Sequence, residues 1–357
     1  MKFYILGAGN TGKAYSVFLL HQGHQVMLYD RDPGRLEPIR THGIDATGVV
    51  EGNFPISVTS DLEECRDSDV ILVCTVAAGH RPLARALKSF IQPGQIILVT
   101  NCCWGAVEFD LELGVEAEEK DCPICEMGGQ LILCNSPAPE SVFLKTVKEH
   151  MVLSCIRHSD LQKVLEALTP VFPQLRPGSN VLETSLNQAN PISHGPLALF
   201  NITRIENGED FLLFGTGATE RVTRFMEKID QERVAVIRAC GLPAPTELEL
   251  LNSFWPQRQE SIYDVLHNTK AYSVTKGPKS LNHRYFTEDL PYGLVPYVRL
   301  GRKMGVETPC LTALITMIGM YMDQDYMSQG PEVERLDLNR YLQDNENCGR
   351  TGFGNPC

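Results

Sequence analysis

Residues 3 to 12 read FYILGAGNTG, a short apolar run followed directly by the glycine pattern Gly7-x-Gly9-x-x-Gly12. An apolar strand that turns on glycines and opens a helix presents backbone N–H groups to a pyrophosphate. The amino end of that helix, expected over residues 12–22, adds the partial positive charge of the helix dipole. The segment therefore predicts a dinucleotide site, and its candidate pyrophosphate-binding residues are Gly7, Gly9, Asn10, Thr11 and Gly12.

The side chains after the next predicted strand, residues 25–29, bear on the choice of cofactor. Asp30 ends this strand, and a carboxylate there can accept hydrogen bonds from the ribose of NAD and would repel the 2′-phosphate of NADP. Arg31 follows directly and Arg35 lies four residues further on, and arginines in this turn could pair with that phosphate. The expected cofactor is NAD or NADP, with NAD favoured.

Composition limits the class of protein. A chain of 357 residues, 43% hydrophobic and 21% charged, is typical of a soluble globular protein with room for two domains. The net charge of −12 argues against nucleic acid and anionic membrane surfaces as partners. The start of the chain has no signal-peptide pattern and no stretch could span a bilayer, so we expect a cytoplasmic protein.

The cysteines predict no metal site. The chain has 12 of them, which in a cytosolic enzyme are mostly reduced thiols. Cys122-Pro-Ile-Cys125 is the one CxxC sequence, and it lacks the second pair or the spaced histidines of a zinc site. We expect both cysteines to be core residues of a strand.

Apolar strands alternate with helical segments over residues 1–178, which predicts a Rossmann-type α/β domain with a parallel sheet covered on both faces. Strands are expected at residues 3–6, 25–29, 56–59, 70–74, 96–100, 123–126 and 151–155, and helices at 12–22, 33–43, 62–65, 81–90 and 161–168. The segments 75–80 and 101–104 follow the fourth and fifth strands, at the edge where such sheets bind ligands. In the second segment, Cys102 and Cys103 are expected to fill space.

Helix-period segments dominate residues 179–330, which predicts an all-α second domain that holds the substrate. Its helices are expected at residues 182–205, 219–240, 246–253, 261–270, 294–304 and 308–321. Residues 331–357 lack an apolar stripe and are expected to form a tail. The apolar helix near residues 311–322 is a candidate for the core or for the surface of a homodimer.

Three polar side chains stand out on the first helix of this second domain. Asn187, Asn190 and His194 follow the spacing i, i+3, i+7 of one helical face, and Pro191 is expected to kink the chain. Two amides and an imidazole suit a polar cleft, so Asn187 and Asn190 are candidate substrate-binding residues. A histidine can donate a proton near neutral pH, as reduction of a carbonyl or imine requires, although a single histidine in such a place is more often structural.

A second polar cluster, residues 282–296, reads NHRYFTEDLPYGLVP. With the downstream sequence GVETP at 305–309, the Asn-Pro-x-x-His sequence at 190–194 and the glycine fingerprint, it resembles the octopine/nopaline (opine) dehydrogenase family over residues 1–340. One departure is Gly195, which separates His194 from the proline that often follows it directly in the family.

The resemblance implies an NAD(P)H-dependent reductive condensation of an amino acid with a 2-oxo acid, and the reverse oxidation. It implies that His194 is the proton donor and Asp289 its charged partner. A carboxylate beside an imidazole fixes the tautomer and favours the protonated ring. Arg284 is the candidate for binding a substrate carboxylate, because the guanidinium fork matches that group; the other interpretation is a structural salt bridge to Glu288 or Asp289.

Two other functions are weighed against this one. A ketopantoate-like or other 2-oxo acid reductase shares the domain plan but typically carries a lysine on the first helix of the second domain, and residues 183–200 contain none. A non-catalytic nucleotide-sensing protein would have no need for the complete set of His194, Asp289 and Arg284.

Overall fold

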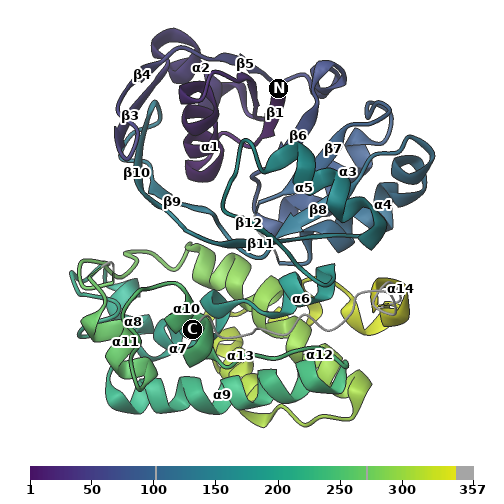
Figure 1. Cartoon of the computed structure of the whole chain (residues 1–357). Coiled ribbons are helices and arrows are strands. Elements are labelled where there is room, and N and C mark those ends of the chain that lie inside the picture. The colour runs from purple at the N-terminus through teal and green to yellow at the C-terminus, as the bar shows by residue number, and fades with distance from the viewer. Residues whose placement is uncertain (101–102, 271, 343–357) are drawn as a thin grey trace. The chain divides into compact units, whose positions relative to one another are not determined.

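The computed structural model describes residues 1–100, 103–270 and 272–342, and Figure 1 labels its helices and strands. These residues form two compact units. Unit 1 comprises Met1–Ser185 together with the described residues from Asp337 onward, and unit 2 comprises Leu186–Leu336. The boundaries expected from the sequence, after residues 178 and 330, fall a few residues before these breaks.

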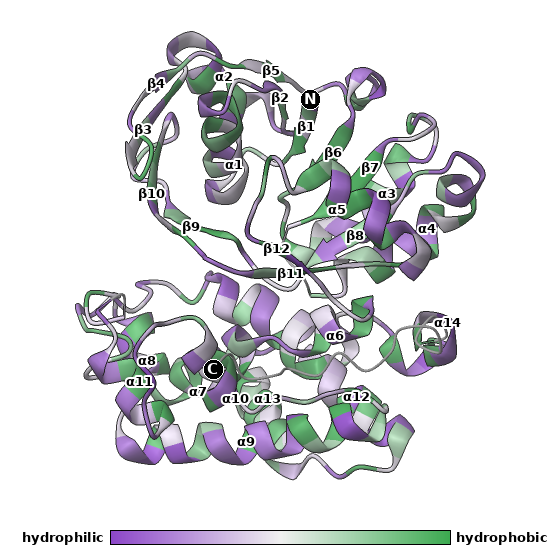
Figure 2. Ribbon diagram, in the orientation of Figure 1, coloured by the Kyte–Doolittle hydropathy of each residue, from purple (hydrophilic) through white to green (hydrophobic). Residues whose placement is uncertain are grey.

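The main sheet of unit 1 has the strand order β12-β11-β8-β7-β6-β1-β2-β5. Neighbouring strands are parallel except β8 and β11, which are antiparallel, so the expected Rossmann-type sheet is confirmed with a reversed edge. β6 and β7 are buried along their whole length and hydrophobic throughout, as a strand covered on both faces requires (Figure 2). The strands are β1 (Lys2–Leu6), β2 (Gln25–Tyr29), β5 (Ser57–Thr59), β6 (Val70–Val73), β7 (Ile96–Val99), β8 (Ile124–Met127), β11 (Met151–Cys155) and β12 (Leu175–Pro177).

The helices of unit 1 follow the strands as expected, with one addition. The sequence analysis did not predict α4, which begins directly after the segment that follows β7. Within that segment Asn101 and Cys102 lie outside the described residues, whereas Cys103 is buried. The helices are α1 (Asn10–His21), α2 (Pro33–His42), α3 (His80–Leu87), α4 (Gly105–Glu119) and α5 (Leu161–Leu168), with the short turns η1 (Leu62–Asp67), η2 (Ala77–Gly79) and η3 (His158–Asp160).

A second, smaller sheet in unit 1 was not predicted. Its strands, in the order β4-β3-β10-β9, are β4 (Gly52–Phe54), β3 (Ile44–Gly48), β10 (Ser141–Val147) and β9 (Ile132–Asn135). α1 packs against β9 and β10 as well as against the main sheet (Figure 1). The Lys13 ammonium donates hydrogen bonds to the carbonyls of Ala138 and Pro139, at 3.2 and 2.7 Å, which ties α1 to the turn between β9 and β10.

Unit 2 is helical, as predicted, but its first helix is not continuous. The helix expected over 182–205 is divided into α6, α7 and α8, with Asn187 and Gln188 outside any helix. Residues 285–294, within the polar cluster at 282–296, form a π-helix. The elements are α6 (Val181–Leu186, which crosses from unit 1), α7 (Ala189–Phe200), α8 (Ile202–Glu206), α9 (Glu220–Ala239), α10 (Glu247–Ser253), α11 (Ile262–Asn268), η4 (Tyr285–Leu294), α12 (Val295–Met304), α13 (Pro309–Met322), η5 (Tyr326–Ser328) and η6 (Val333–Arg335).

The chain after residue 330 differs from the expected tail up to residue 342. Val333 is buried in unit 2, and α14 (Leu338–Leu342) packs in unit 1. There the Arg340 guanidinium and the Tyr341 hydroxyl both donate to the buried carboxylate of Asp110, at 2.8 and 3.0 Å. Residues 343–357 of the expected tail lie outside the described residues. Among the described helices, none combines the length and the apolar character that crossing a membrane needs.

The contact between α1 and β1 depends on Gly12. A Cβ at this position would lie 1.8 Å from the carbonyl oxygen of Gly7, so α1 cannot pack on the glycine turn with any larger residue. We expect Gly12→Ala to lower the free energy of unfolding by about 3 kcal/mol, the upper end for overpacking, measured by urea denaturation. Gly9→Ala is the matched control, because nothing lies within 4 Å of a Cβ there. Equal stability of the two variants would contradict this account.

Candidate functional site

The glycine turn of unit 1 has the geometry of an anion site. Gly7 has a φ of +106°, which favours glycine, and its N–H donates to the Tyr29 carbonyl at 2.8 Å. Gly9 is the N-cap of α1, and no side chain caps this helix end. The backbone N–H groups of its first turn, at Asn10 and Thr11, are therefore left for a ligand. The open space at Gly9 fits a pyrophosphate, so these residues suit a dinucleotide.

Asp30 lies at the end of β2 and faces this turn. Its Oδ2 accepts the N–H of Ala8 at 2.9 Å, and its Oδ1 accepts the N–H of Asp32 at 3.0 Å. The residue is only 8% exposed, so its carboxylate is fixed in place. Arg31 is exposed, and Arg35 makes a long contact of 3.8 Å with Asp32 between two exposed side chains. An anionic group fixed at the end of β2 is the arrangement expected for NAD.

The turn has further support that the sequence analysis missed. The Gln130 side chain donates to Thr11 Oγ1 at 2.9 Å, and the Cys134 thiol donates to the Asn10 carbonyl at 3.5 Å. Both come from the segment around β9. No local pattern marks Gln130, because its role depends on a long-range contact between the two parts of unit 1.

In unit 2 the structure brings His194, Asp289 and Arg284 together, as the sequence analysis proposed. The Nδ1 of His194, on α7, lies 2.9 Å from Oδ2 of Asp289, on η4. The Nη2 of Arg284 lies 3.4 Å from Oδ1 of Asp289 and 3.4 Å from Oε2 of Glu288. The side chain of Asp289 is 1% exposed, against 13% for His194 and 34% for Arg284. The carboxylate is thus buried behind two side chains that reach solvent.

The charges around Asp289 keep it ionised. Burial alone would raise the pKa of the Asp289 carboxyl, but Arg284 and His194 outweigh burial and hold that pKa below its ordinary value. The ionised carboxylate accepts a hydrogen bond from the Nδ1–H of His194, which leaves Nε2 for a reacting group. This arrangement orients Nε2 of His194 for proton transfer to or from a reacting group.

The approach of α7 to η4 requires the small residue that follows His194. A Cβ on Gly195 would lie 2.7 Å from Leu294 Cδ1 and 3.1 Å from Leu314 Cδ2. Gly195, the departure from the His-Pro sequence of the family, therefore lets α7 pack closely on η4 and α13. This packing brings α7, which carries His194, against η4, which carries Asp289.

Two aromatic side chains, Tyr285 at the start of η4 and His283 just before it, lie near His194. The Tyr285 ring lies 4.2 Å from the His194 ring, centroid to centroid, and 4.4 Å from the His283 ring. Burial, together with His194 and Arg284, lowers the pKa of His283. Neither Tyr285 nor His283 received a role from the sequence, although both lie within the cluster at residues 282–296.

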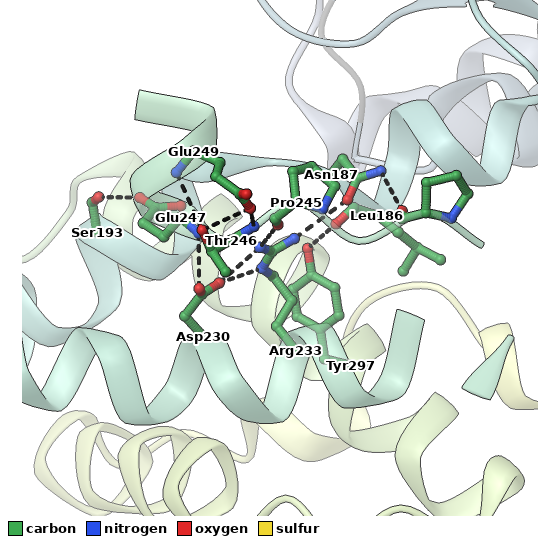
Figure 3. Close-up of polar contacts among 11 residues, drawn as sticks. Leu186, Asn187, Ser193, Asp230, Arg233, Pro245, Thr246, Glu247, Glu249 and Tyr297 are labelled. Carbon is green, nitrogen blue, oxygen red and sulfur yellow. Dashed lines mark hydrogen bonds and ion pairs between the residues drawn. The ribbon is translucent and has the colours of Figure 1, made fainter. Parts of the chain in front are cut away.

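Asn190 lies on α7 four residues before His194, on the same helical face as predicted, whereas Asn187 does not share that face. α7 begins at Ala189, so Asn187 precedes the helix. Its side chain donates to the Pro243 carbonyl at 3.2 Å and accepts from Arg233 at 3.4 Å (Figure 3). Asn187 therefore belongs to the scaffold of unit 2, whereas Asn190 is exposed on the first turn of α7. The expected kink at Pro191 also differs, because Pro191 lies in that first turn, where a helix tolerates proline.

The CxxC cysteines are buried core residues, and Cys125 lies on β8. The Cys122 thiol donates to the Gln92 carbonyl at 2.9 Å. Within the described ranges, no group of three or more His, Cys, Asp or Glu side chains is arranged to hold a metal ion.

Comparisons with known proteins connect both units to enzymes. Residues 177–322 match the family model of the NAD/NADP octopine/nopaline dehydrogenase alpha-helical domain. An opine dehydrogenase from Arthrobacter sp. (strain 1C) is 33% identical over 341 residues, which cover 94% of this chain and 95% of that protein. The chain belongs to the opine dehydrogenase family. D-nopaline dehydrogenase from Agrobacterium tumefaciens (strain T37) is 24% identical, over 88% of this chain and 84% of that protein.

Solved structures show the same fold. Octopine dehydrogenase in complex with NADH and agmatine superposes with a TM-score of 0.73 at 17% identity, covering 96% of this chain and 95% of that one. Yersinopine dehydrogenase with NADP+ bound gives a TM-score of 0.73 at 15% identity, covering 96% and 97%.

As an opine dehydrogenase family member, the protein is an NAD(P)-dependent oxidoreductase that acts on CH–NH groups. The predicted enzyme class and cofactor class are therefore confirmed. Residues 3–108 match the model of ketopantoate reductase PanE/ApbA, but this match is confined to the dinucleotide-binding part. The family match of the helical unit indicates the function, because residues 177–322 match the octopine/nopaline dehydrogenase model. This match favours neither the 2-oxo acid reductase nor the nucleotide sensor considered above.

The buried Asp289 carboxylate makes the free energy of unfolding depend on pH in the acid range. Its pKa is lowered in the folded protein from the ordinary 3.8, so its contribution is complete above about pH 4 and is lost as the pH falls through the folded pKa. We expect Asp289→Asn to cost no more than about 3 kcal/mol at pH 7, because Arg284 is partly exposed.

The measurement is chemical unfolding of both proteins between pH 7 and pH 3, in which the difference should shrink below pH 4. Asp323→Asn is the control, since this exposed aspartate has a left-handed backbone that asparagine also adopts. A difference that stays constant down to pH 3 would exclude a stabilising charge on Asp289.

Proposed function

We propose that this opine dehydrogenase family member condenses the amine of an amino acid with the carbonyl of a 2-oxo acid, with His194 as the general acid and Asp289 as its charged partner. The single observation that carries the proposal is the contact of 2.9 Å between His194 Nδ1 and the buried, ionised Asp289. The relative from Arthrobacter, an opine dehydrogenase by name, supports the reaction type. A homodimer and a cytoplasmic location stay predictions of the sequence.

In the proposed steps, Nε2 of His194 transfers the proton, because Nδ1 is bound to Asp289. The amine attacks the carbonyl carbon, and the resulting hydroxyl must be protonated before it can leave as water and a C=N bond can form. Because Nδ1 of His194 is held by Asp289, Nε2 donates this proton. When bound, the nicotinamide supplies hydride to the carbon of the C=N bond. In the reverse direction His194 accepts the proton, and Asp289 stabilises the charged ring.

Arg284 is proposed to bind a substrate carboxylate. Both proposed substrates carry a carboxylate, and the net charge of −12 means that these groups must be held by local cations. The ion pairs of Arg284 with Asp289 and Glu288 support the structural interpretation, and they also orient the guanidinium. Because the side chain is one-third exposed, part of its planar fork can reach a carboxylate. Asn190, exposed on α7, stays a candidate for a polar contact with substrate.

His194→Ala tests the proposed acid. We expect kcat for reductive condensation to fall by about 10²- to 10⁴-fold, while NAD(P)H affinity stays within about twofold of wild type. The assay is NADH and NADPH oxidation across amino acids paired with pyruvate, glyoxylate and 2-oxoglutarate, and cofactor binding is followed by fluorescence titration. His158→Ala, in η3 of unit 1, is the control. Turnover of His194→Ala at the wild-type rate would remove His194 from the mechanism.

We propose NADH as the preferred cofactor, because the carboxylate of Asp30 is fixed at the end of β2. Asp30→Ala should weaken NADH binding by about tenfold or more, the effect of losing hydrogen bonds to a charged group, and should weaken NADPH binding less. Arg31→Ala is the companion variant and should leave NADH affinity unchanged. Dissociation constants for both cofactors decide the question, and tighter binding of NADPH by the wild type would overturn the preference.

A further inference from the structure

A second buried carboxylate lies beside the helix that carries His194. Glu247 begins α10 and is fully buried. Its Oε1 lies 2.6 Å from Ser193 Oγ on α7, and within the described structure its Oε2 has no hydrogen-bond partner (Figure 3). Ser193 is the residue directly before His194.

The surroundings of Glu247 do not compensate a negative charge. The nearest cation, Arg233 on α9, is already bound to Asp230, with its Nη2 2.7 Å from Oδ1. The other oxygen of Asp230 accepts the backbone N–H of Glu247 at 2.8 Å. The phenol of Tyr272, in the segment that follows α11, is a further titratable group that interacts electrostatically with Glu247. An ionised Glu247 would thus be a second buried anion with its one nearby cation already paired.

The protonation of Glu247 follows from this environment. Burial raises the pKa of the Glu247 carboxyl to about 8; Asp230 adds to the rise, while Ser193 and Arg233 oppose it. At neutral pH the group is a carboxylic acid. Its carbonyl oxygen accepts the hydrogen bond of the Ser193 hydroxyl, and its own O–H is then the group without a partner, which costs less than an unpaired charge.

The same polar network fixes the chain where it enters α7. Arg233 donates to Asn187 Oδ1 and to the Pro245 carbonyl, and the Tyr297 hydroxyl donates to the Leu186 carbonyl at 2.7 Å. Figure 3 shows Arg233 and Tyr297 bound to the stretch before α7, and Glu247 bound to Ser193 within α7. The orientation of the turn that holds His194 therefore depends on groups from α9, α10 and α12.

We propose that Glu247 is a positioning residue for the condensation: as a neutral acid it binds Ser193 and holds the turn of α7 that presents His194 to Asp289. This inference rests on the proposed role of His194. Ionisation of Glu247 at alkaline pH places a second buried negative charge beside Asp230. The repulsion between the two carboxylates loosens this turn. Because the folded pKa is raised from 4.5 to about 8, stability is complete below about pH 4.5 and is lost as the pH rises towards 8.

The test compares Glu247→Gln, Ser193→Ala and their combination by kcat and KM between pH 6 and pH 10. The amide oxygen of Glu247→Gln keeps an acceptor for the Ser193 hydroxyl, and the amide cannot ionise. For Glu247→Gln we expect near wild-type kcat at pH 7 and loss of the decline in kcat that ionisation of Glu247 is expected to cause in the wild type near pH 8. Ser193→Ala should lower kcat about tenfold with little change in KM, and the double variant should be no slower.

Glu249→Gln, two residues along α10 in the exposed capping box, is the matched control and should change stability without changing the pH profile. An alkaline decline of unchanged position in Glu247→Gln, or full kcat in Ser193→Ala, would overturn the proposal.

A readout independent of turnover separates this proposal from the proposed function. In histidine-labelled protein, the Nδ1–H signal of His194, assigned by its absence from His194→Asn, should be lost above about pH 8 in the wild type and persist in Glu247→Gln. If no substrate pair turns over and this difference is still seen, the proposed function fails and the positioning role stands. Identical behaviour of the two proteins would overturn the positioning role.

Discussion

The helical unit is organised around one constraint, the ionised carboxylate of Asp289 in a buried position. A buried charge is tolerated only when oppositely charged or donating groups surround it. His194 and Arg284 meet this need from two directions, one from α7 and one from the start of η4. The same two contacts place His194, the proposed proton donor, and a cation side by side at partly exposed positions. The requirement for stability and the requirement for chemistry are therefore met by the same atoms.

The order of strands and helices was readable from the sequence because it depends on local periodicity. Buried strands such as β6 and β7 are continuous apolar runs, and α9 shows a clear helical period. The second sheet left no such signal. β3 and β10 pair in parallel although they lie far apart in the chain, and both are partly exposed without a continuous apolar run, so only the folded unit shows that they are strands.

The site was predictable to the extent that a family pattern marked it. His194, Asp289 and Arg284 came from that pattern, and the structure brings them together. Helical spacing alone did not distinguish His194 from Asn187, because spacing says nothing about where a helix is interrupted. The break before Ala189 turns Asn187 into a partner of Arg233. A polar residue that satisfies a buried network and one that meets a ligand look alike in a sequence and differ only in their neighbours.

Two buried carboxylates of unit 2 illustrate how the neighbours decide. Asp289 has Arg284 and His194 beside it, and its pKa is lowered; Glu247 has only a cation already paired with Asp230, and its pKa is raised to about 8. One group is therefore an anion at neutral pH and the other an acid. Each state suits its position, since the anion stabilises the charged imidazole and the acid adds no charge beside Asp230. If instead Asp289 were neutral and Glu247 ionised, His194 would lose its counter-charge. An uncompensated anion, Glu247, would then lie beside α7.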